Sequence, residues 1–169
     1  MPGDGSDNGP EAADRDALLA AGRRVVTTEA RALDALADAL DESFADAVGL
    51  ILAATGRVIV SGMGKSGHVA RKMAATFAST GRPAHFVHPA EASHGDLGMM
   101  AVGDVALMIS NSGETPELAD MIAYTRRFRI PLIGMAGRAG STLLRRADVA
   151  LLLPAAEEAC GTGVVPTAS

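Results

Sequence analysis

Two short polar segments of the sequence carry residue types that could bind a phosphate group. The first, Ser-Gly-Met-Gly-Lys-Ser-Gly-His at residues 61–68, follows the apolar run at residues 57–60. The second, Ser-Asn-Ser-Gly-Glu-Thr-Pro at residues 110–116, begins where the apolar run 104–110 ends. Glycine lets a backbone approach a phosphate closely, and hydroxyl, amide and ammonium groups donate hydrogen bonds to its oxygens.

The first segment matches two familiar phosphate patterns only in part. Residues 62–67 fit G-x-G-x-x-G, but a dinucleotide site also needs an acid at the end of the next strand. The next apolar run along the chain, residues 84–88, ends at His88, and the first acid beyond it is Glu91. Residues 64–66 resemble the end of a P-loop, but Ile59 stands where the P-loop requires glycine. The P-loop interpretation therefore fails, and a dinucleotide oxidoreductase remains the weaker alternative.

The elements around these segments predict an α/β fold. The amino-terminal part predicts one or two helices over 14–40, with Leu18, Val25, Leu33, Leu36 and Leu40 on one apolar face, and another helix over 41–54. Short apolar runs without clean alternation follow, as expected for strands buried on both faces. We predict strands at 57–60, 84–88, 104–110, 131–137 and 149–153, helices at 67–80, 116–128 and 141–147, and a helical turn near 94–100.

Alternating strands and helices predict a three-layer α-β-α sandwich with a five-stranded parallel sheet. In the flavodoxin-like order 2-1-3-4-5, the loops 61–67 and 110–115 follow neighbouring strands and face each other at the switch point. Thr115 is then the expected N-cap of a helix whose first residue is Pro116. Both loops could close on one phosphate, although such loops are also ordinary turn chemistry.

Composition limits the classes of function. The 169 residues are 48% hydrophobic and 21% charged, which is typical of one globular domain. A net charge of -5 with scattered basic residues argues against a nucleic-acid partner. The single cysteine, Cys160, excludes an intrachain disulfide, and no apolar run approaches the roughly 18 residues that span a bilayer. We expect a cytoplasmic protein with no membrane partner and a disordered tail at residues 1–12.

Residues 61–100, 109–118, 145–153, 157–160 and 166–169 together resemble the sugar isomerase (SIS) domain, and in particular the D-arabinose-5-phosphate isomerase family. The resemblance implies an aldose–ketose isomerase that interconverts D-ribulose 5-phosphate and D-arabinose 5-phosphate for lipopolysaccharide or capsule synthesis. A SIS module that binds phosphosugars without converting them is the alternative.

The resemblance also implies roles for individual residues. Those implied to bind the substrate are Gly64, Ser66, Ser110, Asn111, Ser112 and Thr115. Those implied in catalysis are Lys65, Glu117, Glu158 and His94, and the family links the last to a metal such as zinc. The residues themselves assign no metal site and no cofactor, since His85 and His88 would point to opposite faces of a strand. Glu117 could equally be an acid that complements a helix dipole.

The end of the chain differs from the family pattern. Family members usually continue with another helix, a segment carrying a further histidine and often a pair of CBS domains, whereas this sequence stops at Ser169. We therefore expect a single SIS domain over residues 13–169 without that extension. The resemblance, together with apolar surface on the first helices and the last strand, predicts a homotetramer built from dimers.

Overall fold

The computed structural model describes residues 14–160, which divide into two compact units. The first contains residues 14–35 and 156–160, and the second is Leu36–Ala155. The expected tail at residues 1–12 lies outside the described residues, and the single domain over residues 13–169 stays a prediction. Within the described part of the chain, no helix combines the length and apolar character needed to cross a membrane.

Helix α1 (Arg15–Ala39) begins in the first unit and is one continuous helix, as the sequence allowed. None of its residues is buried, so its apolar face lies at the surface of the described residues, as the sequence predicted. Leu18 and Leu33 are exposed, while Val25 and Leu36 are only half-buried. The helical spacing is confirmed, but no described residue covers the outer part of that face.

The second unit contains the predicted parallel sheet. Its strands are β1 (Val58–Gly62), β2 (Ala84–Phe86), β3 (Val105–Ile109), β4 (Leu132–Ala136) and β5 (Val149–Leu152), in the order β2-β1-β3-β4-β5. All neighbouring pairs are parallel, and β1 and β3 are in register to their carboxyl ends, where Gly62 is opposite Ile109. The flavodoxin-like order is therefore confirmed, and the switch point lies between β1 and β3.

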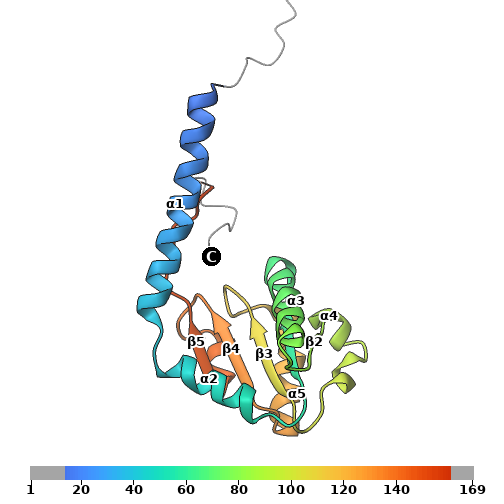
Figure 1. The fold of residues 1–169 in the computed structure, drawn as a ribbon. Coiled ribbons are helices and arrows are strands. Elements are labelled where there is room, and N and C mark those ends of the chain that lie inside the picture. Colours follow the sequence, from blue (N-terminus) through green and yellow to red (C-terminus); the bar gives the residue numbers. More distant parts are fainter. Residues whose placement is uncertain (1–13, 161–169) are drawn as a thin grey trace, which may run out of the picture. The chain divides into compact units, whose positions relative to one another are not determined.

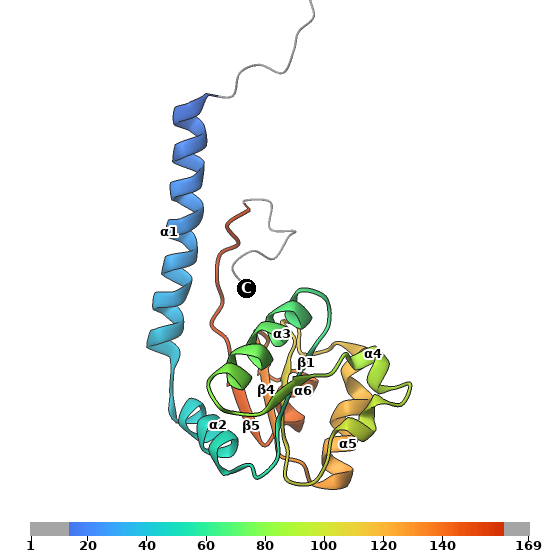
Figure 2. The ribbon, with the colours of Figure 1, turned by 45° about the vertical axis from the view of Figure 1, so that its right-hand side comes forward.

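Helices cover both faces of this sheet (Figures 1 and 2). They are α2 (Glu42–Ala53), α3 (Gly64–Ser79), α4 (Pro89–Ala92), α5 (Ala119–Phe128) and α6 (Thr142–Arg146), with 3-10 turns η1 (Asp96–Met99) and η2 (Pro116–Leu118). Val58 and Val60 pack in one core with α2 and α3, whereas Ile59 packs in the other with α4, α5 and α6. Side chains along β1 therefore alternate between two cores, one on each face of the sheet, which confirms the three-layer sandwich.

Several predicted boundaries were wrong, and each shift has a local cause. The strand β1 continues to Gly62 and α3 begins at Gly64, so the expected loop 61–67 is reduced to a turn at Met63. The strand expected at 84–88 ends at Phe86, because Pro89 starts α4 and His88 serves as its N-cap residue. His88 therefore follows the strand, and the argument that it faces away from His85 on a common strand fails.

Burial on both faces holds only for the inner strands. All five residues of both β1 and β3 are buried, whereas β5 alternates between half-buried and exposed positions. Leu152 at this edge is 50% exposed. An edge strand has a sheet neighbour on one side only, so fewer elements are available to cover it.

Two glycines allow α3 to start directly after β1. A Cβ at Gly67 would lie 2.6 Å from the carbonyl oxygen of Gly62. A Cβ at Gly62 would lie 2.9 Å from Ile109 O and 3.0 Å from Ser66 O. The first turn of α3 thus approaches the ends of β1 and β3 more closely than any residue with a side chain permits.

This contact predicts the effect of one added methyl group. Gly67→Ala should destabilise the second unit by about 1–3 kcal/mol, because the Cβ has no room and must move backbone atoms. The matched control is Gly49→Ala in α2, where a Cβ meets no atom within 4 Å. That substitution should be neutral or stabilising by up to about 1 kcal/mol. Urea denaturation of both variants tests the difference, and equal stabilities would contradict the close approach.

Candidate functional site

The start of α3 is a suitable place for an anion. Met63 precedes the helix in an extended conformation and makes no capping hydrogen bond through its side chain. The first turn contains no acidic residue, so no carboxylate compensates the positive end of the helix dipole. Lys65 is exposed there and Ser66 is half-buried. A helix start with this composition favours a phosphate oxygen.

The loop after β3 is organised around a buried hydroxyl. Ser110 is 3% exposed, and its Oγ accepts a hydrogen bond from Gly113 N at 3.0 Å. Its Oγ also lies 2.6 Å from Thr115 Oγ1. Thr115 is the N-cap residue of η2 and Pro116 its first residue, as predicted, but the Thr115 side chain makes no capping hydrogen bond. When Ser110 donates to Thr115, the Thr115 hydroxyl keeps its own hydrogen for another acceptor.

Two exposed polar side chains occupy the middle of this loop. Ser112 Oγ accepts a hydrogen bond from Glu114 N at 3.2 Å, which leaves the Ser112 hydroxyl hydrogen able to donate. Asn111 is exposed beside it, and its backbone oxygen accepts from Gly137 N at 2.9 Å. The loop therefore holds its own shape through buried contacts and keeps polar groups on its outer side.

The segment after β4 braces this loop, which the sequence did not indicate. Leu143 N donates to Gly113 O at 3.0 Å, and Thr142 N donates to Glu114 Oε1 at 2.9 Å. Gly113 has a φ of 64°, and a Cβ there would collide with the buried Ser141 side chain. These residues lie about thirty positions beyond the loop, so only the fold brings them together.

The third part of this edge consists of α4, which follows β2, and η2, which follows the loop after β3. Glu117 is exposed on η2, two residues after Thr115, and α4 packs against η2. A shallow hollow beside α4 is lined by His88, Ala90, Glu91, His94 and Asp96. His88 is half-buried and His94 is exposed. Because parallel strands end at the same edge, Glu117 and His94 are on the side of the sheet that carries the two loops.

The hollow contains residue types that can bind metal ions, but they are not placed together as a metal site. The buried Nδ1 of His88 has no hydrogen-bond partner within residues 14–160. Across the same residues, no group of three or more His, Cys, Asp or Glu side chains is placed to hold a metal ion. The described side chains thus do not form a complete metal site.

One predicted site residue belongs to the other unit. Glu158 is half-buried in an irregular segment of the first unit, whereas Lys65, Glu117, His94 and the loop residues belong to the second. Its membership of the site stays a prediction. The second unit by itself brings together the start of α3, the loop 110–116, η2 and α4 at one edge.

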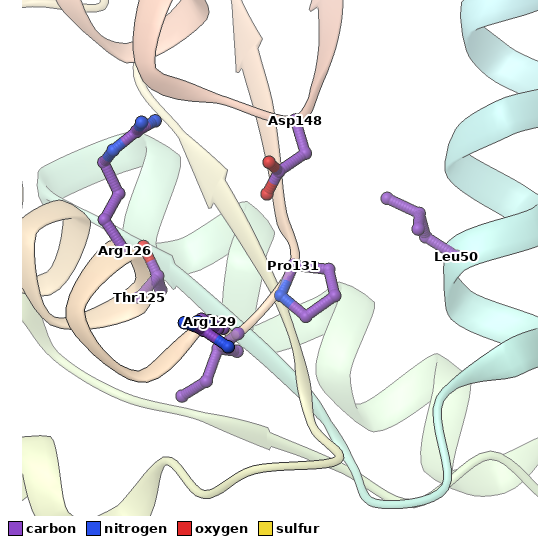
Figure 3. Close-up of a pocket in the computed structure, with 7 residues that line it drawn as sticks. Leu50, Thr125, Arg126, Arg129, Pro131 and Asp148 are labelled. Atoms are coloured by element: carbon purple, nitrogen blue, oxygen red, sulfur yellow. The ribbon is translucent and has the colours of Figure 1, made fainter.

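A different pocket lies at the opposite edge of the sheet, at the amino ends of β4 and β5 (Figure 3). Arg126, Arg129 and Asp148 are among its lining residues. Asp148 Oδ2 accepts from Leu132 N at 2.8 Å, and Arg126 donates to Arg146 O at 3.2 Å. These polar groups tie helix and strand ends together, and the pocket contains none of the predicted site residues.

The fold and the site define a class: a doubly wound α/β protein with two polar loops at its switch point, where ligands bind in such folds. The model of the SIS domain matches residues 51–169, and the chain belongs to the SIS domain family. The chain is 49% identical over 149 residues to the arabinose 5-phosphate isomerase KdsD of Escherichia coli O157:H7. The aligned residues make up 88% of this chain and 45% of that protein.

Two further comparisons agree. The arabinose 5-phosphate isomerase KdsD of Pseudomonas aeruginosa is 48% identical over 147 residues, or 87% of this chain and 45% of that protein. The structure of Escherichia coli CFT073 c3406 in complex with arabinose 5-phosphate superposes with a TM-score of 0.88 and 37% identity, covering 92% of this chain and 83% of that one. The chain spans about half the length of the curated relatives it matches.

The contact between Glu114 and α6 predicts a pH dependence. Hydrogen bonds from the Thr142 side chain and backbone hold the pKa of Glu114 below its ordinary value of 4.5. A lowered pKa in the folded state means that the carboxylate stabilises the fold above pH 4.5 and loses this effect as the pH falls through the lowered pKa.

The measurement compares the unaltered chain with Glu114→Gln by urea denaturation from about pH 3 to about pH 7. The unaltered chain should be the more stable of the two near pH 7, and the difference should shrink below pH 4.5 as Glu114 is protonated. A difference that stays constant over the whole range would show that the charge of Glu114 does not brace the loop.

Proposed function

We propose that this chain carries the catalytic domain of an aldose–ketose isomerase that interconverts D-ribulose 5-phosphate and D-arabinose 5-phosphate. Two kinds of observation support the proposal. The chain resembles isomerases of that name over 88% of its length, and a structural neighbour with 37% identity was solved with arabinose 5-phosphate. The residues that the reaction needs, a phosphate-binding edge with an adjacent lysine and carboxylate, are present in the second unit.

One observation carries the proposal: the backbones of two polar segments meet at Gly62. Ile109 O and Ser66 O each lie within 3.0 Å of the position that a Gly62 Cβ would occupy. The first turn of α3, which carries Ser66, and the loop that begins at Ser110 therefore start at adjacent points of the sheet. A single phosphate can then receive hydrogen bonds from both segments.

In this proposal, the phosphate is held by Ser66, Ser112 and Thr115 together with backbone groups at Gly64 and Asn111. Ser110 acts on the phosphate through Thr115, whose hydroxyl it orients. A phosphate bound away from the reacting carbons contributes binding energy that positions C1 and C2 of the sugar. The brace from α6 fixes the loop before the sugar arrives, which reduces the ordering cost of binding.

The reaction itself needs a base, a cation and an acid. Glu117 removes a proton from C1 of ribulose 5-phosphate, and the electron pair forms a cis-enediolate. Lys65 stabilises the negative charge that develops on oxygen. Returning the proton to C2, with proton exchange between O1 and O2, gives the aldose. Glu158 is proposed to assist this exchange, and His94 to line the sugar site.

We also propose that the chain assembles as a homotetramer, a dimer of dimers, and that its product supplies lipopolysaccharide synthesis. The assembly is supported by exposed apolar side chains on α1 and on the edge strand β5. The pathway rests on the resemblance to the isomerase family. Sedimentation velocity at micromolar concentration tests the assembly, and a stable monomer would contradict it.

Removing a single donor should weaken phosphosugar binding. Ser66→Ala and Ser112→Ala should each cost about 1–3 kcal/mol of binding free energy for ribulose 5-phosphate, since a charged acceptor loses a hydrogen bond. Calorimetric titration measures the change. Ser79→Ala is the matched control, because Ser79 bonds only to Thr76 O at the far end of α3. Unchanged affinity in both site variants would show that the phosphate does not bind at these loops.

Replacing the proposed base should slow the chemistry more than the binding. Glu117→Gln should lower turnover by about 10²–10⁴ and leave the affinity for ribulose 5-phosphate nearly intact. Asp120→Asn is the control, because Asp120 is exposed in the first turn of the following helix. Deuterium exchange at C1 in D₂O detects enediolate formation even where net isomerisation is slow.

Two further variants extend this measurement. Glu158→Gln should slow exchange with affinity retained, whereas Lys65→Met should also weaken binding because its ammonium attracts phosphate. If all variants exchange as fast as the unaltered chain, these residues are not the catalytic groups. If the unaltered chain binds ribulose 5-phosphate and shows no exchange, the chain is a phosphosugar-binding module without catalysis.

A further inference from the structure

Helix α1 carries an exposed apolar stripe in the first unit. Leu19, Val26 and Leu33 are 58%, 67% and 67% exposed. They are spaced by seven residues, which is two helical turns, so they lie on one face. No residue of α1 is buried by the described chain. Three large apolar side chains in one line are more than the isolated exposures that a surface helix normally carries.

A hollow interrupts the stripe and gives it a shape that another helix can fit. The residues that line it are Leu18, Leu19, Gly22, Arg23, Val26 and Thr27. A Cβ placed on Gly22 would meet no atom within 4 Å. A side chain from a facing helix can therefore enter between Leu19 and Val26, as knobs enter holes in paired helices.

The charges of α1 identify the partner. The first half of the helix holds three arginines and one acid, and the second half holds three acids and one arginine, all exposed: Arg15, Asp16, Arg23 and Arg24, then Glu29, Arg31, Asp34 and Asp38. This order opposes the helix dipole, which favours acids at the start and bases at the end. An isolated helix gains nothing from it, but a second copy in the opposite direction places positive on negative.

We propose that α1 pairs antiparallel with α1 of a second copy of this chain. With the two-fold axis at Val26, the two Val26 side chains are opposite each other and Leu19 is level with Leu33. Arg23 and Glu29 are each three residues from Val26, so each is level with the other's opposite charge. A parallel pair would instead place Arg23 beside Arg23 and Glu29 beside Glu29, which is repulsive.

This pairing does not depend on the proposed reaction, since it uses no site residue and is tested without substrate. It specifies the surface and the direction of one contact between copies, which the proposed tetramer leaves open. The two helix dipoles are also antiparallel in this arrangement, so the ends of opposite sign lie together.

Disulfide cross-linking distinguishes the directions. In a Cys160→Ser background, Val26→Cys should form a cross-linked dimer under mild oxidation. A mixture of Leu19→Cys and Leu33→Cys chains should cross-link to each other, and neither should cross-link to itself. Self-linkage of Leu19→Cys would indicate a parallel pair, and failure of Val26→Cys to link would show that α1 does not pair through this stripe. Either result overturns the proposal.

Charge reversal tests the same contact at equilibrium. Arg23→Glu should raise the dimer dissociation constant on the order of tenfold at low salt, because residue 23 lies level with Glu29 of the opposite helix and within reach of its long side chain. The matched control is Arg24→Glu, which makes the same change on the opposite side of the helix and should have a much smaller effect. Arg23→Glu/Glu29→Arg should restore the affinity.

Sedimentation velocity measures the dissociation constants, and circular dichroism verifies that each variant keeps its helix content. Equal effects of Arg23→Glu and Arg24→Glu, or no recovery in the double variant, would overturn the antiparallel register. Cross-linking is an independent readout, because a cysteine in the stripe leaves the charges of α1 unchanged.

Discussion

The close approach of α3 to the sheet is the constraint on which the site depends. Gly67 lies against the carbonyl of Gly62, and Gly62 lies against the end of β3 through Ile109 O. A methyl group at either glycine would push the helix away from the sheet. Because both positions lack a side chain, the helix begins two residues beyond the end of its strand. Its positive end then lies at the sheet edge, beside the polar loop that follows β3.

The second requirement is a loop that keeps its shape without a ligand. Hydrogen bonds within the loop, centred on Ser110, fix its interior. Bonds from Thr142 and Leu143 to Glu114 and Gly113 fix it from outside. These partners come from the segment between β4 and β5, so the loops that follow β3 and β4 share one rigid arrangement. Such pre-organisation reduces the entropic cost of binding the phosphate that we propose for this loop.

The glycine pattern at residues 62–67 is typical of dinucleotide proteins, but here no acid stands at the end of the second strand. In those proteins an acid at the end of the second strand holds a ribose. Here β2 is only three residues long, and its chain turns through His88 into α4. The edge beside the glycines thus receives an imidazole and a short helix in place of a ribose-binding acid. This agrees with membership of the SIS domain family and with the phosphosugar that we propose as the ligand.

The α/β class, the number of strands and the two polar segments could be predicted from the sequence, because runs of apolar residues and glycine-rich turns are local signals. The boundary between β1 and α3 could not, since the close approach of Gly67 involves an element on the far side of the turn. Nothing in the sequence indicated that Ser141, Thr142 and Leu143 brace the loop, as their contacts cross about thirty residues. The apolar face of α1 could also be predicted, because periodicity shows that a face exists, whereas contacts between distant parts of the fold determine what covers it.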